Sequence, residues 1–262
     1  MAFSIECFSI MLIFSMPRSG STAFAEKLAI DNDLINNKEF FNRNVRGFNP
    51  YLGTYVIKGD LNYVGNFRKV DTQDLIPNLP ADNEKRIQIL KNSPLNIEEY
   101  VVKILPHHVS WISYNLINLF KDVETYILDR KDTLRQFLSW YFANKTKRFH
   151  NRSEEYSGEG FRTYAELTEA YNDSFPNGVK IELIWFERWV QLFQKYVYGT
   201  FVIRKHFSNV KVIKYEDISY QKELGNKKIT IDYTNWVNNI EEVKKFTDEI
   251  SSYKKKIIFN EN

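Results

Sequence analysis

The chain has 262 residues and a formal net charge of +3. With 43% hydrophobic and 26% charged residues, its length and composition are typical of a protein with one α/β core. Basic and acidic residues are interspersed, which argues against a nucleic-acid partner and suits a small anionic ligand. The single Cys7 excludes an intrachain disulfide and favours a reducing, cytoplasmic location, and four histidines without ligand spacing predict no metal.

The apolar run Phe8 to Met16 is too short to span a bilayer, which takes about 20 helical residues. It lacks a basic leader and runs into Pro17, so we predict a buried strand rather than a signal segment. Since no other stretch is long and apolar enough, we expect a soluble protein without a membrane partner.

Alternating strands and helices follow along the chain. Predicted strands are 9–15, 55–58 (weak), 100–105, 123–128, 210–214 and 228–233 (weak); predicted helices are 22–29, 109–120, 133–143, 181–207 and 240–253. Residues 31–50 are expected to be loop, and 87–90 fit a helix or a strand equally. Residues 146–180 are predicted to form a mobile loop or acceptor region. The alternation of strands and helices predicts a single α/β domain, 1–262, with a mostly parallel sheet flanked by helices.

The most informative segment is Phe14-Ser-Met-Pro-Arg-Ser-Gly-Ser-Thr22, between a predicted strand and a predicted helix. Backbone N–H groups at a helix start bind anions, Gly20 permits close approach, and Ser19, Ser21 and Thr22 add hydroxyl donors. Arg18 adds a fixed positive charge. The segment differs from the nucleoside-triphosphate loop because the first Gly and the Lys after Gly20 are missing.

This segment resembles the 5′-phosphosulfate loop of sulfotransferases, which use 3′-phosphoadenosine-5′-phosphosulfate. A second segment, Val123 to Ser139, resembles the family's 3′-phosphate segment, in which an Arg ends a strand and a Ser follows on the next helix. Its Arg-x-Asp-x-Leu-Arg-Gln run is most similar to trehalose 2-sulfotransferase-type enzymes. The resemblance implies a P-loop-like sulfotransferase fold, no metal, and phosphate contacts from Arg130, with Lys131 second, and Ser139. The family's Arg-to-Ser spacing is eight; here Lys131 to Ser139 is eight and Arg130 to Ser139 is nine.

The resemblance also suggests catalytic residues. Arg18 would stabilise charge on the leaving phosphate, and Glu39 is similar to the general base of the trehalose-type enzymes. His107 and His108 are rival bases, and Lys103 on a predicted strand either reaches the sulfate or caps a sheet edge. Val212 to Ile218 is similar to a late family strand ending in Tyr-Glu-Asp-Leu; we expect its acids to cap the next element.

The predicted activity is sulfuryl transfer to a hydroxyl acceptor, with a carbohydrate as one candidate. Two alternatives stay open: an inactive nucleotide-binding protein that holds a partner with Lys145 to Tyr164, and a small-molecule kinase. The missing Lys after Gly20 argues against the kinase. The irregular Arg–Ser spacing is compatible with the hypothesis of an inactive nucleotide-binding protein.

Overall fold

The computed structural model describes part of the chain. The described residues are 11–38, 41, 45–49, 54–57, 82, 85–86, 89, 100–108, 114–146, 164–218 and 231–260.

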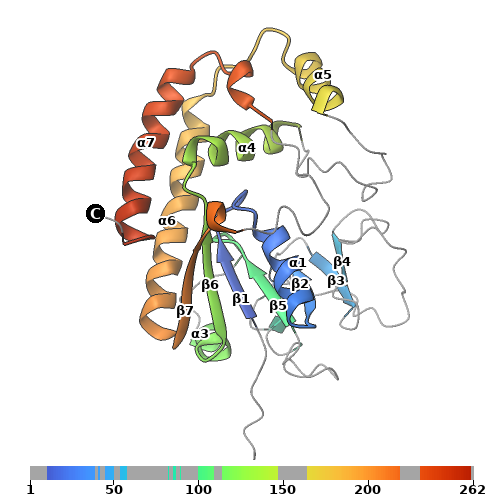
Figure 1. Cartoon of the computed structure of the whole chain (residues 1–262), viewed down its shortest axis with the longest axis vertical. Helices are drawn as coiled ribbons and strands as arrows, with labels where there is room; N and C mark the ends of the chain where they lie inside the picture. The colour runs from blue at the N-terminus through green and yellow to red at the C-terminus, as the bar shows by residue number, and fades with distance from the viewer. Residues whose placement is uncertain are drawn as a thin grey trace, which may run out of the picture. The chain divides into compact units, whose positions relative to one another are not determined.

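The fold is α/β, with a five-stranded sheet in the order β2-β5-β1-β6-β7 (Figure 1). The strands are β1 Met11–Ser15, β2 Ile35–Lys38, β5 Tyr100–Ile104, β6 Glu124–Asp129 and β7 Asn209–Lys214. Pairings β2–β5, β5–β1 and β1–β6 are all parallel. The predicted parallel sheet with helices around it is therefore confirmed.

The helices are α1 Ser21–Asp31, α3 Tyr114–Phe120, α4 Thr133–Thr146, α5 Tyr164–Ser174, α6 Leu183–His206 and α7 Ile240–Ile257. Short 3₁₀ turns cover Tyr215–Asp217 and Tyr233–Trp236. Asp132 begins α4 as predicted, because its carboxylate accepts the Arg135 N–H at 2.9 Å. None of these helices, within the described residues, combines the length and apolar character needed to cross a membrane.

The chain divides into two compact units, each made of three segments. The first unit contains Met1–Ser15, Ser21–Leu128 and Tyr198–Val212; the second contains Met16–Gly20, Asp129–Val197 and Ile213–Asn262. The boundaries fall at the carboxyl ends of β1 and β6, the two strands that precede the predicted phosphate segments. The single domain stays a prediction.

In the first unit, β1 forms the centre of the sheet because Leu12, Ile13 and Phe14 are all inaccessible to solvent. Helix α1 packs against β1, β2 and β5. Phe24 of α1 meets Tyr126 of β6 edge to face, with ring centroids 5.3 Å apart.

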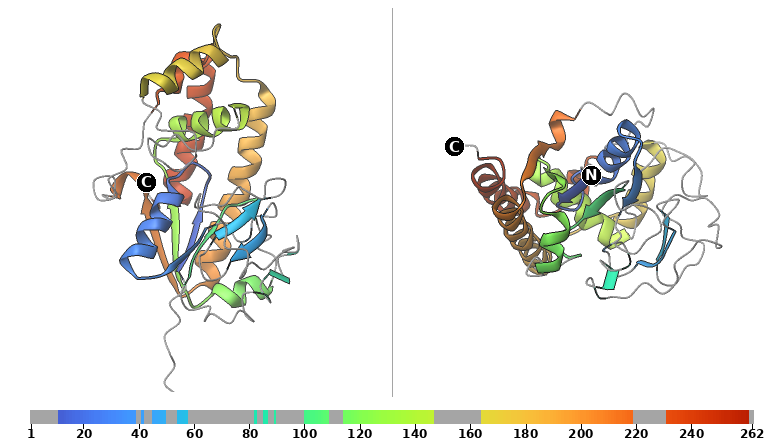
Figure 2. Two further views of the ribbon diagram at one scale, coloured as in Figure 1. Left: turned by 90° about the vertical axis from the view of Figure 1, so that its right-hand side faces the viewer. Right: turned by 90° about the horizontal axis from the view of Figure 1, so that it is seen from below.

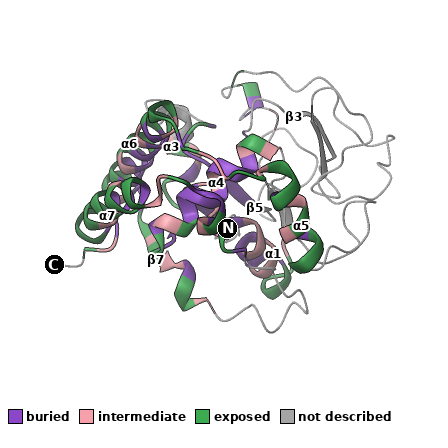
Figure 3. Ribbon diagram, turned by 90° about the horizontal axis from the view of Figure 1, so that it is seen from above, coloured by how far each residue is buried: buried purple, intermediate pink, exposed green. Residues whose placement is uncertain are grey.

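In the second unit, α4 packs against α7. The buried side of α4, purple in Figure 3, carries Phe137, whose ring stacks on Phe186 at 5.5 Å and meets Trp189 of α6 at 5.6 Å. Trp189 is fully buried, so α6 contributes an aromatic side chain to this core.

Three sequence predictions are wrong where the structure describes the chain. Residues 31–50 contain β2 and also β3 Val45–Asn49, which pairs antiparallel with β4 Thr54–Ile57 in a separate two-stranded sheet (Figure 2). Cross-strand pairing overrides the low strand propensity of their Asn and Gly residues. The region 146–180 contains α5, whose buried Leu167 and Tyr171 lie four residues apart on one face. At 228–233 the described residues Ile231 to Tyr233 form no strand, and a 3₁₀ turn begins at Tyr233.

Other predictions fall only partly within the described residues. Residues 85, 86 and 89 are helical, whereas 87, 88 and 90 of the undecided segment lie outside the described part of the chain. Most of the polar segment after α4, residues 147–163, also lies outside it.

Candidate functional site

The loop between β1 and α1 has an unusual backbone. Arg18 has φ 63° and Gly20 has φ 80°, both in the left-handed region. Gly20 adopts this conformation freely, but a side chain such as that of Arg18 costs about 1 kcal/mol there. Alternating backbone conformations of this kind turn successive N–H groups toward one side, as in anion-binding loops. The predicted role of Gly20 therefore has a structural counterpart.

The two segments that resemble the phosphate-binding motifs meet within the second unit. Arg18 Nε donates a hydrogen bond to Ser139 Oγ at 2.9 Å, across 121 residues of sequence. The side chain of Gln136, one turn earlier on α4, donates to the carbonyl oxygen of Pro17 at 3.0 Å. A hydroxyl that accepts one bond keeps its own hydrogen for donation. Ser139 can therefore hold Arg18 and still bind an anion.

Arg130 follows β6 and is buried, with 8% of its surface exposed. Its guanidinium lies over the Tyr215 ring at 5.0 Å, and its Nε is 3.9 Å from a carboxylate oxygen of Glu216. Among the described residues, this Nε has no hydrogen-bond partner. The negative charges of Asp132 and Glu216 offset the burial of this cation only in part, so an incoming anion would be favoured here.

The guanidinium groups of Arg18 and Arg130 influence each other. Burial lowers the pKa of Arg18, and the positive charge of Arg130 lowers it further, against the raising effect of Tyr233 and Tyr171. Burial also lowers the pKa of Arg130. Arginine nevertheless stays cationic in proteins. Two partly desolvated cations therefore face the same region, which is an arrangement suited to a multiply charged anion.

The residue after Arg18 in the loop, Ser19, carries a small hydroxyl group. The Ser19 side chain is fully buried, and within the described part of the chain its Oγ has no hydrogen-bond partner. Because an unpaired buried hydroxyl is unfavourable, a ligand oxygen at this position would restore a lost hydrogen bond.

The Tyr215–Asp217 turn has a role different from the one expected. The side chain of Lys131 is exposed, and its backbone N–H donates to Glu216 at 3.0 Å. Asp132 N–H donates to the same carboxylate at 3.3 Å. Glu216 thus caps the turn that leads into α4, an earlier element, rather than the element that follows it. The prediction that these acids cap the next element is wrong for Glu216.

Lys103 and Thr22 meet within the first unit. The Lys103 side chain is buried on β5, and its Nζ donates to Thr22 Oγ1 at 3.0 Å. Ser21 is buried at the start of α1. A cation therefore lies beside the last residues of the predicted phosphate loop, at the carboxyl end of the parallel strands.

The two histidines among the candidate bases differ in their exposure to solvent. His107 is exposed after β5, whereas His108 is buried and its Nδ1 accepts the Leu105 N–H at 3.2 Å. The two rings lie 4.5 Å apart, edge to face. His108 therefore supports the turn after β5, and His107 is the accessible one of the pair. Glu39 lies outside the described residues.

A buried charged cluster that no sequence signal indicated adjoins Arg18 and Arg130. Asp129, Gln136 and Lys254 are each no more than 1% exposed, and Lys254 Nζ lies 3.1 Å from Asp129 Oδ1. Burial raises the pKa of Asp129 and lowers the pKa of Lys254, while their mutual attraction opposes both shifts. Lys254 gave no signal because it begins the run Lys254-Lys255-Lys256, a pattern typical of a solvated helix end.

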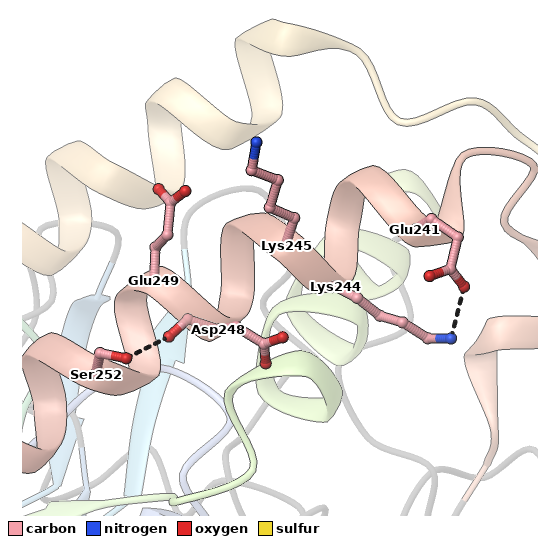
Figure 4. A pocket seen from close by; sticks show the side chains of 6 residues that line it. All are labelled: Glu241, Lys244, Lys245, Asp248, Glu249 and Ser252. Carbon is pink, nitrogen blue, oxygen red and sulfur yellow. Dashed lines mark hydrogen bonds and ion pairs between the residues drawn. The ribbon is translucent and has the colours of Figure 1, made fainter.

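One surface hollow among the described residues does not point to a site. A hollow on α7 is lined only by exposed residues of that helix: Glu241, Lys244, Lys245, Asp248, Glu249 and Ser252 (Figure 4). Lys244 pairs with Glu241 at 2.7 Å, as expected for solvated helix surface. Within the described residues, no three His, Cys, Asp or Glu side chains gather as metal ligands would.

No protein-family model matches the chain, and no curated protein sequence is significantly similar to it.

Proposed function

We propose that the chain is a sulfotransferase with a P-loop-like sulfotransferase fold that uses 3′-phosphoadenosine-5′-phosphosulfate. The observation that carries the proposal is the hydrogen bond from Arg18 to Ser139. It joins the two segments whose resemblance to sulfotransferase motifs assigns them to the phosphates of one nucleotide. Two unrelated turns would have no reason to meet at these particular residues.

Unused donors support the same proposal. Ser19 Oγ and Arg130 Nε are buried and, among the described residues, lack hydrogen-bond partners. Both are residues to which the resemblance gives phosphate contacts. Arg130 fits the 3′-phosphate better than Lys131, because the side chain of Arg130 is buried and that of Lys131 is exposed. A phosphate would supply the acceptor oxygens that both groups need.

In the proposed reaction, the acceptor oxygen attacks the sulfur as the bond between sulfur and the phosphate-linked oxygen breaks. Adenosine 3′,5′-bisphosphate leaves with the bonding electron pair, and the acceptor proton passes to a base. Arg18 and the loop N–H groups would stabilise the charge on the leaving phosphate. Lys103, hydrogen-bonded to Thr22, would add charge at the sulfuryl end. Glu39 would be the base, with His107 as the alternative because it is accessible.

Calorimetric titration tests the nucleotide assignment. We expect adenosine 3′,5′-bisphosphate to bind more tightly than ATP with magnesium, because two separated phosphates match two separated groups of donors. Tighter binding of ATP with magnesium would instead indicate a kinase, and binding of neither would refute the nucleotide site.

Turnover is tested separately by incubating the chain with the sulfuryl donor and sugar, phenol or peptide acceptors, and measuring release of the bisphosphate. A sulfated acceptor formed in step with the bisphosphate supports the enzyme. Bisphosphate binding without turnover on any acceptor class would favour the inactive nucleotide-binding protein.

A further inference from the structure

Lys254 is a fully buried cation far along the chain from the predicted phosphate segments. Its Nζ donates to Asp129 Oδ1 at 3.1 Å, to the carbonyl oxygen of Arg130 at 3.1 Å and to Gln136 Oε1 at 2.5 Å. These three acceptors match the three donors of an ammonium group. All of them lie in the second unit, at the turn after β6 and on the first turns of α4.

The cluster reaches the β1–α1 loop through Gln136. Its side-chain nitrogen donates to the carbonyl oxygen of Pro17 at 3.0 Å and to Asp129 Oδ1 at 3.1 Å. An amide side chain has one accepting and one donating end. Because Lys254 requires the accepting end, the donating end must face Pro17, the residue before Arg18. The charge of Lys254 thereby selects the orientation of Gln136 that anchors the loop.

The same cluster holds the backbone on both sides of the Asp129–Arg130 peptide. Arg130 N–H donates to Asp129 Oδ1 at 2.7 Å, and the Arg130 carbonyl accepts from Lys254. A buried ion pair is a costly way to pack α4 against α7, and apolar residues of similar volume often stabilise a fold as well. Packing alone therefore gives little reason for these charges.

We propose that Lys254 is a positioning residue that fixes, through Gln136 and Asp129, the backbone carrying Arg18 and Arg130. The C-terminal helix α7 thus sets the geometry of the anion-binding arginines. The link to nucleotide affinity rests on the proposed function, whereas the anchoring of the loop does not.

The experiment uses the full chain and two variants that do not leave a charge buried alone. Gln136→Met keeps the Lys254–Asp129 pair and removes the bond to Pro17. The double variant Asp129→Asn with Lys254→Met removes both charges together, since Lys254→Met alone would leave a buried carboxylate unpaired. The control is Lys256→Met, at an exposed position of the same helix.

Three quantities are measured: the thermal unfolding midpoint, amide hydrogen exchange at residues 18–20 without ligand, and the Kd of adenosine 3′,5′-bisphosphate. Both variants should stay folded and exchange these loop amides at least tenfold faster than the wild type. Their Kd should rise about tenfold, because each binding event must then order the loop backbone. The control should match the wild type in all three.

Unchanged loop exchange in a folded variant overturns the inference, since Lys254 would then only stabilise the helices. Faster exchange with an unchanged Kd also overturns it, because the loop would not need the anchor. Faster exchange in a chain whose wild type binds no bisphosphate supports the anchoring and refutes the proposed function instead.

Discussion

The sharpest test of the candidate site replaces Arg130 by alanine and uses Arg135→Ala as the matched control. The two arginines lie five residues apart on either side of the start of α4. Arg130 is buried, and among the described residues its Nε has no hydrogen-bond partner, whereas Arg135 is exposed and pairs with Asp132 at 3.8 Å. The comparison therefore separates a specific buried contact from the general positive field of this region.

The magnitude follows from the contact that is lost. A hydrogen bond to a charged group contributes about 1.5–3 kcal/mol, so Arg130→Ala should weaken bisphosphate binding roughly 10- to 150-fold. Arg135→Ala should change affinity by less than about fivefold, because exposed ion pairs contribute about 0–1 kcal/mol. The stability of Arg130→Ala should change little. Losing the contact with Tyr215 at 5.0 Å is offset by removing a poorly paired buried cation.

The assay is calorimetric titration of each variant with adenosine 3′,5′-bisphosphate at fixed ionic strength, alongside thermal unfolding. Equal affinities of wild type and Arg130→Ala would refute the role of Arg130, provided that both proteins are folded. Equal losses in both arginine variants would refute it too, since only long-range attraction would then be at work.

Three further predictions concern other residues. Arg18→Gly should keep the unfolding midpoint within a few degrees, because relief of the positive φ of 63° offsets the lost bond to Ser139, while bisphosphate binding falls at least tenfold in calorimetry; full binding would contradict the loop assignment. Glu39→Gln should abolish turnover and spare nucleotide affinity, and full activity in a bisphosphate-release assay would transfer the base role to a histidine. Glu124→Gln should lower stability at pH 7 by about 1 kcal/mol and lower it less at pH 3. Hydrogen bonds from Lys211 and then Tyr126 hold the pKa of Glu124 below its ordinary value of 4.5, so this stabilisation is present above pH 4.5 and is lost as pH falls through the lower folded-state pKa. A variant whose unfolding midpoint differs from that of the wild type equally at both pH values would rule this out.

Local sequence signals were sufficient for the central elements of the fold. The run Met11 to Phe14 is apolar throughout, and Pro17, which cannot donate to a strand pairing, follows shortly after it. The β6–α4 corner was equally clear, since a strand, a polar turn and the capping Asp132 follow one another. Strands β2 and β3 were missed because their stability comes from pairing with β5 and β4, and such pairing leaves no mark in a local pattern.

For the candidate site, too, the sequence indicated some features and not others. The residue types in the loop Arg18 to Thr22, and the Arg and Ser of the second segment, were readable because anion binding needs cations, hydroxyls and glycine in a short stretch. The sequence could not show that Arg130 is buried and Lys131 exposed, since adjacent side chains of one charge differ only in direction.

What the sequence by itself determined is which residues have the chemistry to bind an anion and on which strand-to-helix corners they lie, because these follow from residue type and local order. Only the tertiary structure decided that Arg18 meets Ser139, and that Lys254 reaches Asp129 across 125 residues. Such contacts depend on how α4, α7 and the loop after β1 pack together. A buried lysine is indistinguishable in sequence from its solvated neighbours until the packing around it is known.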